Sequence, residues 1–204
     1  MQTFVHFLII GVVGYLCGSF NSAIVVSKKL CGFDIRTKGS GNAGLTNVHR
    51  TLGGKYTLMV LAGDIIKAAI ALEVGGYLMG SFGKLIAGAF VIAGHVFPLY
   101  FGFKGGKGIL VGATMVALFD WRIFLILFAI FVVLVAITRW ISLGSIVGAL
   151  GFPILTWAFY GDVKTTALSA AMAAAVIFMH RSNIVRIVHG TENKLSLKGK
   201  NVDH

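Results

Sequence analysis

Charged side chains are scarce in this sequence, and their scarcity excludes an ordinary soluble protein. Of the 204 residues, 12% are charged and 57% are hydrophobic, and the mean hydropathy is +0.88. Soluble domains are about 25% charged. The chain therefore belongs in a membrane, where a net charge of +11 indicates basic cytoplasmic loops rather than a nucleic-acid partner.

Cysteine is also sparse, and several catalytic motifs are missing. Cys17 and Cys31 form neither a CxxC nor a CxxxC pair, which gives no support to a zinc site or a disulfide framework. The sequence has no His-x4-Asp, no GxSxG and no Walker A motif. We therefore expect no metal ion and no cofactor.

Hydrophobic runs divide the chain into seven candidate transmembrane helices. They lie near residues 4–27, 56–79, 85–103, 108–119, 123–138, 143–160 and 165–180. The run at 108–119 is short for a bilayer core of ~30 Å. The first run has no preceding basic residue and no cleavage site, so it indicates a retained span rather than a signal peptide.

The distribution of Lys and Arg favours seven spans. With that number, segments 28–55, 104–107, 139–142 and 181–204 share one face and hold most of the basic residues, Lys198 and Lys200 among them. The other face holds only Lys84, Arg122 and Lys164. Because basic loops stay in the cytoplasm, we predict an all-α, polytopic integral membrane protein with seven transmembrane helices, its N-terminus outside and its C-terminus cytoplasmic. Residues 1–204 are expected to form a single domain.

This topology places every polar, glycine-rich segment on the cytoplasmic face. The segments are GSGNAGLTNVHRTLG at 39–53, FKGGKG at 103–108, TRWISLGS at 138–145 and HRSNIVRIVHGTENK at 180–194. The acidic residues on that face are only Asp34, Glu192 and Asp203, too few for a phosphotransferase that uses two metal ions. Function is therefore expected at the cytosolic surface.

The first two segments are suited to bind anions. In FKGGKG, the backbone N–H groups of Gly105, Gly106 and Gly108 are expected at a helix N-terminus beside Lys104 and Lys107, which favours a phosphate. The alternative is a basic turn in which the glycines permit a tight reversal, and residue types alone do not separate the two.

The loop at 39–53 offers Ser40, Asn42, Thr46 and Asn47 as neutral donors and Arg50 as a clamp on phosphate. Composition alone favours a flexible connector for this loop. Two such segments on one face favour anion binding in both.

Three further polar groups lie in or near the spans. His180 and Asn183 are three residues apart, on one helix face at the interface, and could orient a substrate or accept a proton. Asp64 and Lys67 lie within a span, where we expect them to pair with each other or with neighbouring helices. For His95, a structural role is expected.

Four segments together resemble the signature regions of the bacterial acyl-phosphate:glycerol-3-phosphate acyltransferases, the PlsY family. They are GSGNAGLTNVHRTLG, GHVFPLYFGFKGGKGIL, TRWISLGSI and the stretch from HRSNIVR to GTENK, in the family order. Asn21 stands where the family often has proline, and Ala68 where it usually has glycine. Both differences fall in or beside helices, so they bear on local helix geometry.

The resemblance implies roles for individual residues. Ser40 and Arg50 would be essential in the first loop, supported by Asn42 and Asn47, and His180 and Asn183 would serve catalysis. The residues implied to bind glycerol 3-phosphate are Lys104, Gly105, Gly106, Lys107 and Ser142. Glu192 would have a structural role.

The implied reaction transfers an acyl group from acyl phosphate to the 1-hydroxyl of sn-glycerol 3-phosphate and releases lysophosphatidic acid and phosphate. The enzyme would be a monomer among membrane lipids in a bacterial inner membrane, with its active site facing the cytoplasm. Either His180 or the substrate phosphate could act as the base. A membrane carrier of phosphorylated small molecules is the alternative, and its site would lie near the bilayer midplane.

Overall fold

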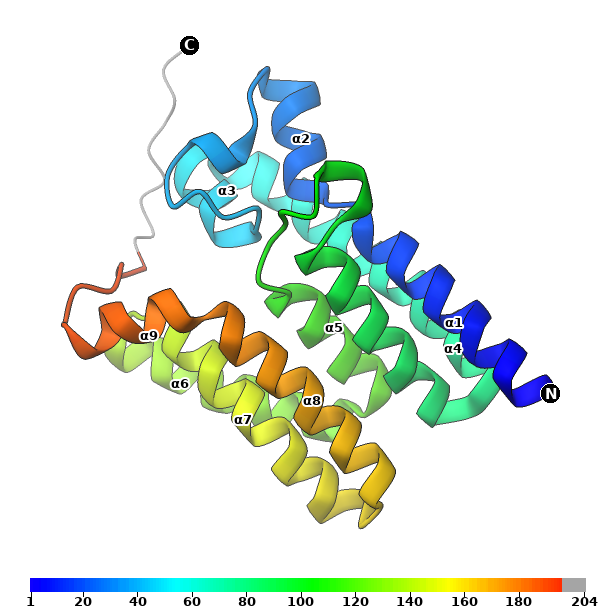
Figure 1. Ribbon diagram of the computed structural model, residues 1–204. Helices are drawn as coiled ribbons and strands as arrows, with labels where there is room; N and C mark the ends of the chain where they lie inside the picture. Colours follow the sequence, from blue (N-terminus) through cyan, green and yellow to red (C-terminus); the bar gives the residue numbers. More distant parts are fainter. Residues whose placement is uncertain (196–204) are drawn as a thin grey trace. The chain divides into compact units, whose positions relative to one another are not determined.

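The computed structural model describes residues 1–195, and helices dominate them (Figure 1). No strand occurs within this range, so the all-α prediction is confirmed. The described residues form two compact units, 1–115 and 116–195. Lys198, Lys200 and Asp203, assigned above to the cytoplasmic face, lie outside the described residues.

Several helices have the length and composition of membrane spans. Gln2–Cys31, Trp121–Thr138 and Ile141–Tyr160 are long and apolar enough to cross a membrane. Val163–Met179 and Arg181–Val188, bent by 60°, would together make a fourth, while Ile109–Phe119 is a shorter apolar helix. These helices indicate a membrane protein, whereas the number seven and the orientation stay predictions.

In the first unit, the N-terminal apolar run is broken into two helices. Helix α1 (Gln2–Ser19) ends before Phe20, whose backbone is extended, and α2 (Ser22–Cys31) begins after Asn21. The buried Asn21 caps α2, because its Oδ1 accepts a hydrogen bond from Ile24 N at 3.1 Å. Asn21 therefore begins a new helix at this break.

Helix α4 (Gly54–Val96) reverses direction at Met79 and Gly80, whose backbones are not helical. Gly80 has φ +59°, which glycine adopts at little cost. The two halves then pack together, because a Cβ on Gly75 would meet the backbone of Gly83. The predicted runs 56–79 and 85–103 are these halves. The second ends at Val96, earlier than predicted, because Pro98 disfavours a helical Phe97.

A buried ion pair joins the break in the first run to α4. Lys67 Nζ lies 2.8 Å from Asp64 Oδ1 and donates to Phe20 O at 2.8 Å, and Ser22 Oγ donates to the same carboxylate. Lys67 Nζ also lies 3.0 Å from Nδ1 of the buried His95. The predicted pairing of Asp64 and Lys67 is therefore confirmed, and the pair also satisfies carbonyls at the end of α1.

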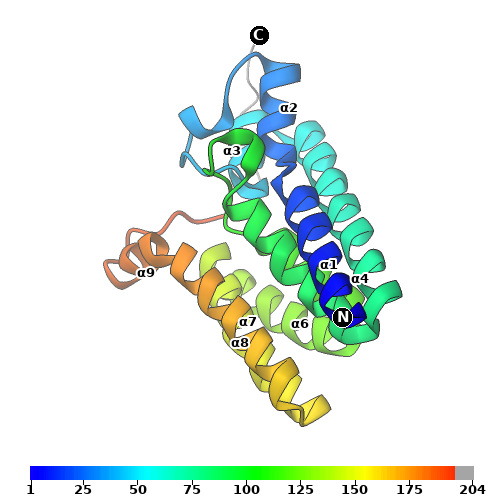
Figure 2. The ribbon, with the colours of Figure 1, turned by 45° about the vertical axis from the view of Figure 1, so that its right-hand side comes forward.

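The second unit consists of antiparallel helices and a bent end. Helices α6 (Trp121–Thr138), α7 (Ile141–Tyr160) and α8 (Val163–Met179) lie side by side in order (Figures 1 and 2), and α9 (Arg181–Val188) follows the bend. After α9, the chain returns to the start of α7, where Leu195 N donates to Arg139 O at 2.7 Å. This return brings residue 192 next to α7.

Candidate functional site

The first polar loop is organised around the side chain of Asn47. Its Oδ1 accepts a hydrogen bond from Ser40 N at 2.9 Å, and its Nδ2 donates to the carbonyls of Ile35, Lys38 and Asn42. Asn47 lies on α3 (Leu45–Leu52) and is 1% exposed. It was predicted to support substrate binding, but in the structure its side chain is engaged with the loop itself. It thereby holds the exposed Ser40 in place.

Glycine is required where this loop folds against Asn47. Gly39 has φ +58°, and a Cβ there would overlap Asn47 Oδ1. The loop therefore has a defined conformation in place of the flexible connector that composition alone favours. Arg50 lies on the same short helix as Asn47, one turn further on, and is half-buried.

The second polar loop follows a short 3-10 helix, η2 (Leu99–Phe101), and differs from the prediction. Gly105 N donates to Val96 O at 3.0 Å, and Gly106 N donates to His95 O at 3.2 Å. These two amides close the loop onto the end of α4, so the expectation that they face an anion is wrong. A Cβ on Gly106 would lie 2.6 Å from Ala43 O and would also overlap the His95 ring. Close packing is what requires glycine here.

Lys107 and Gly108 keep the predicted relation to a helix start. Helix α5 begins at Ile109 and runs to Phe119, and Gly108 O accepts its first helical hydrogen bond, from Gly112 N at 2.8 Å. The first turn of a helix carries backbone N–H groups without helical partners and a partial positive charge. An anion near Lys107 would be stabilised by both.

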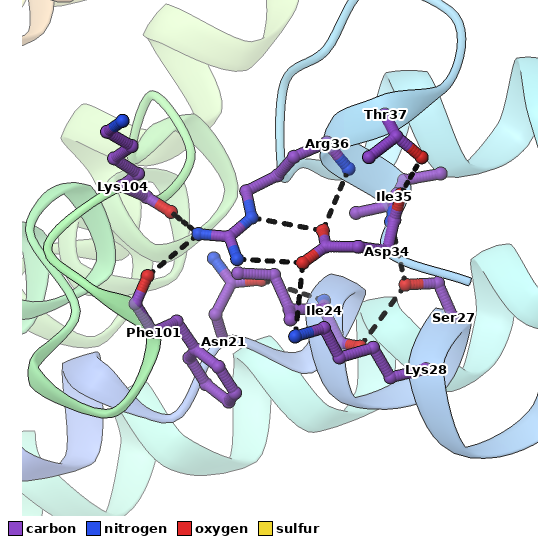
Figure 3. Close-up of polar contacts among 10 residues, drawn as sticks. All are labelled: Asn21, Ile24, Ser27, Lys28, Asp34, Ile35, Arg36, Thr37, Phe101 and Lys104. Atoms are coloured by element: carbon purple, nitrogen blue, oxygen red, sulfur yellow. Dashed lines mark hydrogen bonds and ion pairs between the residues drawn. The ribbon is translucent and has the colours of Figure 1, made fainter. Parts of the chain in front are cut away.

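The two polar loops are joined through Arg36, on the 3-10 helix η1 (Ile35–Thr37) (Figure 3). Its Nη1 donates to Phe101 O at 2.7 Å and to Lys104 O at 2.8 Å. Its Nε and Nη2 form a fork on the two carboxylate oxygens of Asp34, at 3.0 and 2.7 Å. The structure therefore brings together the segments that carry Ser40 and Lys104.

The charge balance of these loops favours an anion. Asp34 is the only acidic residue among residues 28–55, and it is paired with Arg36 and with Lys28, whose Nζ lies 3.2 Å away. Hydrogen bonding from the Arg36 guanidinium holds the pKa of Asp34 well below its usual range. The acid is thus ionised and neutralised locally, and the other basic residues of this segment outnumber it.

In the second unit, Glu192 joins two of the predicted site residues. Its Oε1 accepts from Ser142 Oγ at 3.0 Å and from Asn183 Nδ2 at 2.8 Å, and its Oε2 accepts from Arg186 Nε at 2.9 Å. Burial raises the pKa of Glu192, but the hydrogen bonds from Asn183, Arg186 and Ser142 lower it more, so the pKa falls below its ordinary value. Glu192 therefore acts as an ionised hub.

His180 lies at the bend between α8 and α9 and is buried. Its Nδ1 lies 2.8 Å from Val176 O, and a carbonyl can only accept, so Nδ1 carries a hydrogen. In the neutral ring, Nε2 then has the lone pair that could accept a proton. The backbone of Asn183 is tied to His180, because Asn183 N donates to His180 O at 2.8 Å.

Two residues at the centre of these contacts were missed by the sequence analysis, Asp34 and Arg36. A signal was present, because the pattern Asp-x-Arg occurs twice, as DIR at 34–36 and as DWR at 120–122. In both, the Asp caps a helical turn through the Arg backbone N–H and forks with the Arg guanidinium. Which other groups each Arg reaches depends on the tertiary structure.

The described residues offer little for metal binding. Within residues 1–195, no group of three or more His, Cys, Asp or Glu side chains is arranged to hold a metal ion.

Comparisons with known proteins agree on one family. The family described as glycerol-3-phosphate acyltransferase matches residues 8–190. A glycerol-3-phosphate acyltransferase of Thermoanaerobacter sp. (strain X514) is 42% identical over 187 residues, covering 92% of this chain and 94% of that protein. One from Clostridioides difficile (strain 630) is 40% identical over 201 residues, covering 94% and 97%.

Two solved structures are also similar. One is a crystal structure of PlsY (YgiH), an integral membrane glycerol 3-phosphate acyltransferase, in its glycerol 3-phosphate form. It matches with a TM-score of 0.87 and 31% identity, covering 93% of this chain and 96% of that chain. The other, its lysophosphatidic acid form, matches with a TM-score of 0.84 and 30% identity, covering 93% and 95%.

Proposed function

Because this chain belongs to the glycerol-3-phosphate acyltransferase family, we propose that it transfers an acyl group from acyl phosphate to the 1-hydroxyl of sn-glycerol 3-phosphate. The products are lysophosphatidic acid and inorganic phosphate. The observation that carries the proposal is the joining of two basic, donor-rich loops by Arg36 in the first unit. Similar structures in glycerol 3-phosphate and lysophosphatidic acid forms support it.

The reaction presents a problem of charge that these loops can solve. Both substrates carry phosphate groups, which repel each other, so the enzyme must hold two anions close together. Lys104 and Lys107 both precede the start of α5 and are assigned to the phosphate of glycerol 3-phosphate, with Gly105 and Gly106 shaping the loop. Ser40, Asn42 and Arg50 are assigned to the anionic groups of the reaction from the first loop.

The chemical step needs no covalent enzyme intermediate. The 1-hydroxyl oxygen attacks the acyl carbon, the new ester bond forms, and the bond from that carbon to the phosphate oxygen breaks. Acyl phosphate is already activated, so the leaving phosphate departs with its bonding electrons and no further cofactor is needed.

The proton of the attacking hydroxyl has two possible acceptors. One is His180 Nε2, and the other is the phosphate of glycerol 3-phosphate, whose second pKa is about 6 for an ordinary monoester. We favour the substrate phosphate, with His180 and Asn183 orienting the substrate and Ser142 contributing from α7. Glu192 holds Ser142 and Asn183 for that purpose.

The membrane setting is part of the proposal. Seven spans, an outside N-terminus and a cytoplasmic active site in a bacterial inner membrane would leave the acyl chain of the donor among the lipids while its phosphate reaches the loops. We also propose that the enzyme acts as a monomer.

Purified protein supplied with acyl phosphate and glycerol 3-phosphate should form lysophosphatidic acid, measured by mass spectrometry. Acyl-CoA should not replace acyl phosphate, and comparable turnover with acyl-CoA would refute the donor assignment. The carrier alternative predicts uptake of glycerol 3-phosphate into sealed vesicles without any product. That result would refute the proposed acyltransferase activity.

A further inference from the structure

We propose that Asp34 and Arg36 are positioning residues that fix the second loop for glycerol 3-phosphate. This inference rests on the proposed function. The amides of Gly105 and Gly106 already tie this loop to α4, and Arg36 adds side-chain contacts on both sides of the turn before Lys104, since it donates to Phe101 O and to Lys104 O. Figure 3 shows the Lys104 ammonium pointing away from the guanidinium, so Arg36 places Lys104 without competing for its ligand.

The guanidinium of Arg36 is used almost fully within the protein. Of its five N–H groups, one on Nε and one on Nη2 bind Asp34, and two on Nη1 bind the carbonyls of the second loop. The side chains of Arg36 and Asp34 are 23% and 17% exposed, so water competes little for these bonds. Arg36 is therefore suited to hold the loop rather than to bind substrate itself.

The short segment that carries Asp34 and Arg36 is itself held in place by neighbouring residues. Ile35, between the two residues of the pair, is buried and donates its N–H to Ser27 Oγ on α2 at 3.1 Å. Its carbonyl accepts from Asn47 Nδ2 at 3.2 Å, which links this segment to the loop of Ser40. Because the segment is fixed to the first loop, Arg36 sets the position of the second loop relative to the first.

Removing the Arg36 guanidinium should therefore weaken substrate binding more than turnover. Without its contacts to the carbonyls of Phe101 and Lys104, the second loop samples positions in which Lys104 and Lys107 cannot both contact the same phosphate. The apparent affinity then falls in proportion to the fraction of loops that remain in place. Because the same contacts act on bound substrate and on the transition state, KM changes while kcat changes little.

Arg36→Lys is the decisive variant, because it keeps the charge and removes the geometry. A single ammonium cannot form the fork and also reach two carbonyls. We expect KM for glycerol 3-phosphate to rise about 10-fold, with kcat within about 2-fold and KM for acyl phosphate unchanged. Equilibrium binding of glycerol 3-phosphate without donor should weaken by the same factor.

Arg122→Lys is the matched control. Asp120 and Arg122 form the same fork, with Nε and Nη2 at 3.1 and 2.7 Å from the carboxylate, but they belong to the second unit, where Asp120 caps α6. This variant should leave KM for glycerol 3-phosphate unchanged. An equal rise of KM in both variants would mean a general structural effect and would overturn the inference.

A double variant tests whether the pair acts as one device. Asp34→Asn should raise KM in the same direction, and Asp34→Asn with Arg36→Lys should be no worse than Arg36→Lys alone, because both remove one constraint. Additive effects, or wild-type binding in Arg36→Lys, would overturn the inference. If the wild-type protein binds glycerol 3-phosphate but forms no product, the proposed function is refuted. The positioning role of Arg36 can then still be tested by the equilibrium-binding measurement.

Discussion

Glu192 offers the strongest test of how the second unit is held together. Replacing it by alanine removes one carboxylate that accepts from Ser142, Asn183 and Arg186. Ser142 and Asn183 are buried, so each loses a partner that water cannot easily replace. The segment after α9 would also lose its main polar link to α7.

The magnitude follows from the kind of each contact. A hydrogen bond to a charged acceptor contributes about 1.5–3 kcal/mol, and two such bonds at the low end give about 3 kcal/mol. Arg186 has a side chain that is 35% exposed, so its ion pair adds only about 0–1 kcal/mol. For a chain of this size, 3 kcal/mol corresponds to a fall of roughly 6–12 °C in the unfolding midpoint.

Tryptophan fluorescence in detergent can measure this change selectively, because all three tryptophans, Trp121, Trp140 and Trp157, lie in the second unit. Glu192→Ala should lower the midpoint by the stated amount and also lower kcat, since Ser142 and Asn183 lose their positions. Glu192→Gln, which keeps an acceptor oxygen, should fall between it and wild type.

Glu73→Gln is the control for loss of a carboxylate as such. Glu73 is 68% exposed and 3.7 Å from Lys84, so its removal should not shift the midpoint measurably. A wild-type midpoint and wild-type kcat in Glu192→Ala would refute the claim that Glu192 holds Ser142, Asn183 and Arg186 in place.

The pH dependence has a definite sign. The pKa of Glu192 is lower in the folded protein than its ordinary value of 4.5, so its stabilising contribution is complete above that value. The contribution is lost as the pH falls through the folded pKa. The fall of the wild-type midpoint below about pH 4.5 should therefore be less steep in Glu192→Gln. It should not be abolished, because the hydrogen bond from Arg122 also lowers the pKa of Asp120 in the same unit, which acts in the same direction. An identical slope in both proteins would contradict this account.

Three other predictions address the second loop, the base and the topology. Gly106→Ala should impair folding or substrate binding because its Cβ would overlap His95 and Ala43, whereas Gly148→Ala, in open space on α7, should be tolerated in the same thermal and kinetic assays. His180→Gln should lose much of kcat yet keep a limb of the pH-rate profile near the second pKa of the substrate phosphate, and disappearance of that limb would make His180 the base. In a background without Cys17 and Cys31, a cysteine at the exposed Asp162 should react with an impermeant thiol reagent from outside and one at Thr37 should not; the reverse pattern would refute the topology.

The sequence by itself determined the class of fold and the places where chemistry is concentrated. Long apolar runs require helices in a membrane, because only helices satisfy their own backbone hydrogen bonds there. Gly80 and Pro98 mark helix ends for local reasons of backbone conformation. The pairing of Asp64 with Lys67 also followed from the sequence, since opposite charges three residues apart within an apolar helix have few other partners.

Only the tertiary structure decided how the predicted residues are used. Gly105 and Gly106 were predicted to present amides to an anion, but those amides bind carbonyls at the end of α4, a partner that spacing cannot reveal. Asn47 holds its own loop, and Glu192 binds Ser142 across 50 residues of sequence. Hydrogen-bond partners distant in the chain depend on which backbones packing brings together. For the same reason, DIR and DWR are alike in sequence and in local geometry, yet it is Arg36 that reaches the carbonyls of Phe101 and Lys104.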